Sequence, residues 1–121
     1  MTVLVWIGVG LLGGSAAVAR FWLDGLVSTA TGGTLPWGTF AVNLTGAFIL
    51  GLLTGLTLSS DAELLVGTAT IGSYTTFSTW MLETHRLREA AEFRWAALNI
   101  AGSIVCGVGA AALGRVIGVH L

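Results

Sequence analysis

Residues 67–83 read GTATIGSYTTFSTWMLE, and this stretch decides the fold. Glycine, serine and threonine crowd its middle, and all three form helix poorly. The stretch nevertheless belongs to a segment, residues 63–83, that is long and apolar enough to cross a membrane. Irregular backbone at membrane depth is tolerated only where it is buried in protein or lines a wet cavity. The sequence therefore predicts a spanning helix that is broken at its centre, around Ile71, Gly72 and Ser73.

Three further segments of about 20 apolar residues accompany this one. They cover residues 3–23, 37–58 and 95–119, and polar or turn-rich connectors at 28–36, 59–61 and 84–94 separate the spans. Pro36 suits the start of the second span, and Ser60 or Asp61 can cap the third. We predict an all-α membrane protein with four transmembrane helices in one domain, residues 1–121.

The composition agrees with a lipid environment. Of the residues, 55% are hydrophobic and only 9% are charged, whereas soluble domains have roughly 25% charged residues. The net charge is −1, which argues against a nucleic-acid partner. We therefore expect membrane lipid around the chain and a multi-pass location in the cell membrane (the inner or plasma membrane).

Glycines predict tight helix packing and an oligomer. The chain has 18 glycines, and pairs four residues apart let helix backbones approach closely in lipid. A four-helix unit this small cannot enclose a pore by itself, so we expect it to associate. The pairs are Gly10 and Gly14, Gly51 and Gly55, and Gly114 and Gly118.

Polar side chains at membrane depth are the candidate functional residues, because lipid makes them costly. Asn43 lies in the second span, and Asn99 and Ser103 share one face of the fourth. Arg20 and Glu83 lie near the ends of the first and third spans. A purely structural interpretation remains open for each: hydrogen bonds between helices for the asparagine and serine, and snorkelling for the arginine.

The residues just after the expected break favour a functional interpretation. Phe77 and Trp80 lie on one helix face with Ser78 and Thr79 beside them. A stripe of aromatic residues usually packs in a core, but here it is interleaved with hydroxyls. A helix break also exposes carbonyl oxygens, which suit a small hard cation, and frees N–H groups, which suit an anion.

At these residues the sequence resembles the Fluc/CrcB family of small fluoride channels. Residues 72–80, GSYTTFSTW, followed by Glu83, are similar to the family signature GGFTTFSTF…E. Residues 36–48, PWGTFAVNLTGAF, are similar to the family's P-x-G-T-x-x-V-N-x-x-G-S-F. A run of small residues, 13–19, before Arg20 and Phe21 is a third match. Trp80 stands where the family usually has Phe, and Ser73 where Gly is common.

The resemblance implies an antiparallel dimer with two fluoride pores and a structural sodium ion on the two-fold axis. By motif position, the backbone carbonyls of Gly72 and Thr75 hold the sodium ion. Neutral donors and the electropositive edges of aromatic rings can replace water around fluoride. Arg20 and Glu83 are vestibule or structural polar residues. The expected fluoride pathway consists of Asn43, Phe77, Ser78, Thr79, Trp80 and Ser103.

Other functions fit the sequence less well. A small proton-coupled multidrug transporter needs a carboxylate in its first span, and none precedes Asp24. A structural assembly subunit would not explain hydroxyls and aromatics around a broken helix, and no nucleophile–base pair indicates an enzyme. We therefore predict a passive fluoride-exporting channel that reduces fluoride toxicity, and not an enzyme.

The arginines bear on how two copies would pair. More of them lie on the side of the first and third connectors, so the positive-inside rule favours an N-terminus outside the cytoplasm. A homodimer of inverted copies needs both orientations; a heterodimer with an inverted homologue is the alternative. We favour the homodimer because one chain carries all the pore residues. Arg20, Arg86, Arg88 and Arg94 lie on one side and Arg115 on the other.

Overall fold

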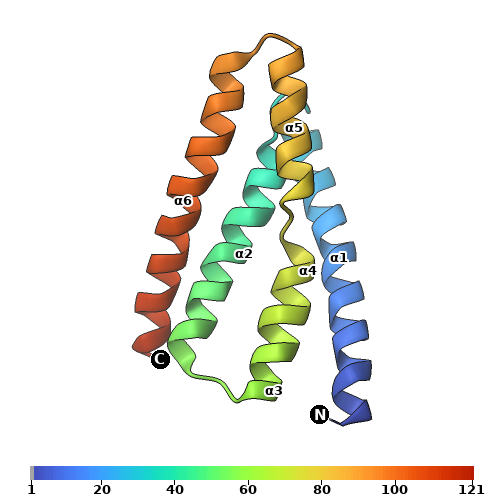
Figure 1. The fold of residues 1–121 in the computed structure, drawn as a ribbon, viewed down its shortest axis with the longest axis vertical. Coiled ribbons are helices and arrows are strands. Elements are labelled where there is room, and N and C mark those ends of the chain that lie inside the picture. Colours follow the sequence, from blue (N-terminus) through green and yellow to red (C-terminus); the bar gives the residue numbers. More distant parts are fainter. Residues whose placement is uncertain (1) are drawn as a thin grey trace.

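A computed structural model describes residues 2–121, and every regular element in that range is a helix (Figure 1). The helices run along one common long axis, and both chain ends lie at the same end of the bundle. The elements in chain order are α1 (Val3–Thr31), α2 (Trp37–Leu56), α3 (Ser60–Ala62), the π-helix η1 (Glu63–Ile71), α4 (Gly72–Tyr74), α5 (Ser78–Glu89) and α6 (Phe93–Val119).

Three helices, α1, α2 and α6, are long and apolar enough to cross a membrane. They correspond to the first, second and fourth predicted spans. Large apolar side chains point outward along them, as Leu11 (67% exposed) and Val105 (70%) illustrate. Such a surface requires lipid or another protein around it. The chain is therefore an all-α, multi-pass membrane protein.

The first helix continues past its predicted end at Leu23 as far as Thr31. Its polar last turns stay helical because their hydroxyls bond within the helix: Ser28 Oγ donates to Asp24 Oδ1 (3.2 Å) and Thr31 Oγ1 to the Val27 carbonyl (2.8 Å). Gly32 ends the helix in the left-handed region (φ 87°). The predicted connector 28–36 is thus too long, and only its second half is non-helical.

The third predicted span consists of two helical pieces. Helix runs from Ser60 through α3, η1 and α4 to Tyr74, Thr75 is extended (φ −81°, ψ 161°), and α5 starts at Ser78. The interruption therefore lies at residues 75–77, and its predicted position at 71–73 is wrong. Those residues stay helical, and the Ile71 carbonyl accepts both the amide (3.0 Å) and the hydroxyl (3.1 Å) of Thr75.

Two further boundaries moved, whereas the second span starts at Trp37, after Pro36, as predicted. Ser59 caps the third segment, accepting from the amide of Ala62 (3.3 Å), so the prediction of Ser60 or Asp61 is wrong. The connector predicted at 84–94 shrinks to 90–92, because α5 continues to Glu89 and α6 starts at Phe93. An i,i+4 contact between His85 and Glu89 (2.9 Å) adds modestly to this last part of α5.

Glycines bring α2 and α6 into backbone contact, which confirms the packing prediction for two of the three pairs. A Cβ added at Gly51 would overlap the Ala111 carbonyl, and one added at Gly114 would overlap the Phe48 carbonyl. Gly55 and Gly118 lie against the facing helix in the same way. Within residues 2–121, the first-span pair, Gly10 and Gly14, has no neighbour inside 4 Å, so it makes no such contact.

Candidate functional site

The asparagine of α2 holds the interrupted backbone. Asn43 Nδ2 donates to the Thr76 carbonyl (2.8 Å), and Asn43 Oδ1 accepts from the Thr76 amide (2.8 Å). One side-chain amide thus replaces both backbone partners that Thr76 would have in a continuous helix. Non-helical backbone away from water needs such a replacement for each N–H and C=O. Asn43 therefore fixes where the two helical pieces meet.

At the interruption, two backbone carbonyls lose the amide groups that would donate to them in a continuous helix. In a continuous helix the Thr76 amide would donate to the Gly72 carbonyl and the Thr79 amide to the Thr75 carbonyl. Instead, the Thr76 amide donates to Asn43, and the Thr79 amide donates to the Thr76 hydroxyl (3.2 Å). Gly72 and Thr75 are the residues whose carbonyls were predicted to hold sodium. The donor set fits that ion, since hard cations prefer oxygen ligands.

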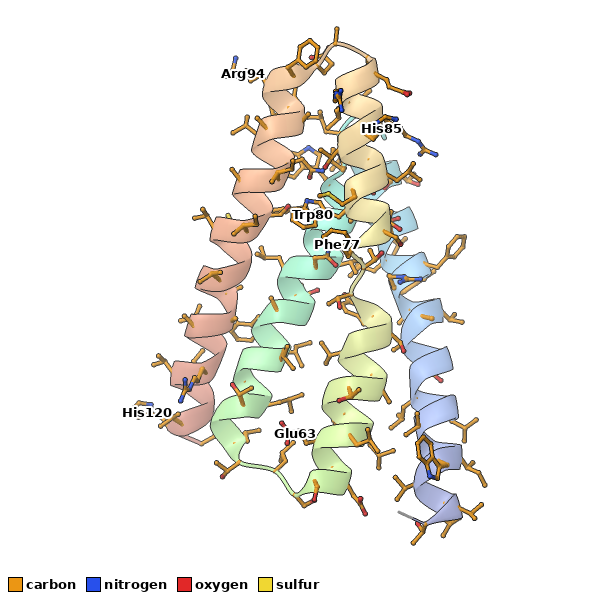
Figure 2. All side chains as sticks on the ribbon, in the orientation of Figure 1. Glu63, Phe77, Trp80, His85, Arg94 and His120 are labelled. Carbon is orange, nitrogen blue, oxygen red and sulfur yellow. The ribbon has the colours of Figure 1, made fainter. Side chains whose placement is uncertain are left out.

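An open pocket of about 580 Å³ faces outward at the interruption. Phe77 and Trp80 project into it from the start of α5, with ring centroids 5.7 Å apart and planes at 82° (Figure 2). Phe77 is 69% exposed. Asn43, Gly72 and Thr75 line the same pocket, so five of the predicted site residues meet there.

Other predicted residues face a second, smaller pocket. Arg20 and Thr79 line a cavity of about 120 Å³ together with Thr39 and Thr76. Glu83 lies beside this cavity and accepts a hydrogen bond from the Thr39 hydroxyl. Most of the predicted site residues thus lie at one of two pockets, and Thr76 lines both.

The two predicted serines differ in their surroundings. Ser78 is exposed, with its hydroxyl 3.4 Å from that of Thr76. The Ser103 hydroxyl is buried and has no hydrogen-bond partner within residues 2–121. One turn closer to the α5–α6 connection, Asn99 bonds to Thr84. The helices α5 and α6 run antiparallel (Figure 1), so the step from Asn99 to Ser103 along α6 leads away from their connection and toward the start of α5.

Comparison with known proteins places these residues in a family. The family model described as CrcB-like protein, Camphor Resistance (CrcB), matches residues 7–115. The chain belongs to the CrcB family. This confirms the resemblance seen in the sequence.

Relatives match this CrcB-family chain over almost its whole length. It is 54% identical over 114 residues to a fluoride-specific ion channel FluC 2 of Mycolicibacterium paratuberculosis, covering 94% of this chain and 93% of the relative. It is 52% identical to a FluC 2 of Mycobacterium bovis, over 95% and 91%. It is 40% identical to a FluC 1 of Symbiobacterium thermophilum, over 93% and 96%.

Two residues of this CrcB-family site were missed from the sequence. Thr39 is 2% exposed and pairs with Glu83. Its position, one turn before Asn43 on the same helix face, was the signal that could have revealed it. Thr76 acts through its backbone as well as its hydroxyl, and no side-chain pattern indicates a backbone contact.

Proposed function

We propose that this chain forms a fluoride-selective channel through which fluoride leaves the cell passively, which reduces fluoride toxicity. The observation that carries the proposal is a match of 54% identity, over 94% of the chain, to a protein named a fluoride-specific ion channel. The pocket beside Phe77 and Trp80 supports it, because aromatic edges and neutral donors meet there at a helix interruption.

The pathway replaces the water around fluoride without trapping the ion. Ser103 has a buried hydroxyl free to donate, and the rings of Phe77 and Trp80 offer electropositive edges. Asn43 Nδ2 carries two hydrogens, and one remains after its bond to Thr76. Of the residues that the structure describes, no arginine lines the larger pocket. Binding then stays weak enough for the ion to leave, as conduction requires.

A second, inverted copy completes the channel in this proposal. The pocket face includes the polar side chains of Asn43, Thr68 and Glu63, and lipid would make their exposure costly. In this proposal the two pieces of the third segment, Ser60–Tyr74 and α5, together cross the membrane as the third of four spans, interrupted at residues 75–77. A sodium ion on the two-fold axis, held by the carbonyls of Gly72 and Thr75, would neutralise oxygens that lack their helical partners. A heterodimer with an inverted homologue is the alternative assembly.

Vesicle flux tests the function directly. Liposomes containing the protein and loaded with potassium fluoride or potassium chloride are treated with a potassium carrier, and ion release is followed with electrodes. We expect rapid fluoride release and retained chloride. Equal release of both ions would contradict a selective channel, and drug-driven proton flux without fluoride flux would favour the multidrug transporter.

The assembly has its own test. A high-resolution experimental structure of the chain expressed alone should show two inverted copies with one ion at their axis, bound to the Gly72 and Thr75 carbonyls. Reporters fused to the C-terminus should report both orientations. A single orientation with inactive monomers would favour the heterodimer, and an axis without an ion would refute the sodium site.

A further inference from the structure

A closed set of hydrogen bonds joins α5 to α6 around one aromatic side chain. Trp80 Nε1 donates to the Asn99 carbonyl (2.9 Å), and Asn99 Nδ2 donates to Thr84 Oγ1 (2.8 Å). Thr84 Oγ1 donates in turn to the Trp80 carbonyl (2.9 Å). The set therefore begins and ends at Trp80, and Asn99 contributes both its backbone and its side chain.

We propose that Asn99 is a positioning residue, which fixes the Trp80 indole beside Phe77 and thereby sets the rate and selectivity of fluoride passage. This inference rests on the proposed channel function. Trp80 and Phe77 line the larger pocket, whereas Asn99 does not. Asn99 therefore acts on that pocket through Trp80.

The bond to the Asn99 carbonyl leaves the Trp80 indole N–H unable to donate to another group. Indole has a single donor, and it already points at the Asn99 carbonyl. The pocket thus meets the edge and face of the ring, and the N–H does not solvate the ion. With the N–H fixed on α6, the ring keeps its edge-on contact with Phe77 at 82°. Because its N–H is bound to the Asn99 carbonyl, Trp80 acts in the pocket through its ring alone.

The position of α5 also depends on Asn99. This helix has 12 residues and follows the non-helical residues 75–77, so no preceding turn fixes its rotation. Thr84 is 9% exposed, and the Asn99 side chain reaches it from α6. Removing that donor leaves a buried hydroxyl short of a partner and lets the start of α5 rotate. Rotation of α5 would move Phe77 and Trp80 together.

Substitutions at both ends of the Asn99–Thr84 bond test the proposal. We expect Asn99→Ala and Thr84→Val each to lower fluoride flux per dimer about tenfold and to lower the fluoride-to-chloride ratio. The double variant should be slowed by less than the product of the two single effects. Each single already removes the shared Asn99–Thr84 bond, together with one bond of its own to the Trp80 carbonyl. Thr84→Ser keeps the hydroxyl and should restore flux. Thr54→Val is the matched control, since within residues 2–121 the Thr54 hydroxyl bonds only to the Gly51 carbonyl of its own helix (2.7 Å).

The outcomes separate positioning from simple structural support. Variants that yield less dimer, yet conduct with the parent rate and ion ratio per dimer, would overturn the positioning role. Effects that multiply in the double variant would overturn the shared bond. If the unmodified protein released no fluoride, the proposed function itself would fail, whereas a conducting parent with unaffected Asn99 and Thr84 variants would refute only this inference.

Discussion

Asn43→Asp should abolish fluoride flux, lowering it at least about 100-fold, while the chain still folds and dimerises. Asparagine gives one donor and one acceptor to Thr76, each at 2.8 Å. Aspartate keeps the size and the acceptor but loses the donor, so a carboxylate oxygen would face the Thr76 carbonyl. That repulsion, added to the charge itself in an anion path, displaces the interrupted backbone and the aromatic pair that follows it.

The same vesicle assay measures this effect, with size-exclusion chromatography to check the dimer. Thr57→Asp is the matched control, because it adds the same charge at the exposed end of α2, outside the pocket. Asp tolerates the left-handed backbone of Thr57 (φ 49°). We expect the control to conduct like the parent. An Asn43→Asp protein that conducts at the parent rate would show that the contact with Thr76 is dispensable.

Hydropathy predicted that the long helices exist and placed the end of the last one correctly at Val119, but it misplaced the end of the first. The prediction placed the end of the first span at Leu23, where apolar residues give way to Asp24. The helix continues because Ser28 and Thr31 satisfy their hydroxyls within it. Hydropathy measures the fit to lipid, and it does not record that a polar turn can stay helical beyond the apolar region.

The position of the interruption depended on another helix. Weak helix formers predicted a disturbance somewhere in residues 67–83, and local propensity favoured Gly72. The backbone opens instead where Asn43, 33 residues away in sequence, can supply both partners of Thr76. A single sequence does not show which distant side chain reaches which backbone group. The same argument explains why Thr76 was missed.

Spacing predicted part of the candidate site. Phe77 and Trp80, three residues apart on a helix, lie together as expected. The separation of Arg20 and Thr79 from Asn43 was not predicted, because it depends on how each helix is rotated against its neighbours. Helix rotation is set by tertiary packing, which periodicity alone does not specify.

The helix that carries Asn43, α2, packs closely on α6. We therefore expect Gly114→Ala to destabilise the protein by about 3 kcal/mol and to lower fluoride flux. The added methyl group would overlap the Phe48 carbonyl and lie 2.9 Å from the Leu52 amide. Both are backbone atoms, which cannot move aside as a flexible side chain can. Lipid offers no hydrophobic force to press the helices back together. Separation would carry Asn43 away from Thr76, because Asn43 belongs to α2.

Unfolding in detergent micelles measures the loss of stability, and Gly109→Ala in the same helix is the control. An added Cβ at Gly109 has no neighbour within 4 Å among residues 2–121, and the residue is exposed. There alanine should leave stability unchanged or raise it by about 0.5–1 kcal/mol, since glycine is the poorer helix former. If Gly114→Ala proved as stable as Gly109→Ala, α2 and α6 could move apart to fit the methyl group without a loss of stability. The close contact of α2 and α6 would then not be what holds Asn43 against Thr76.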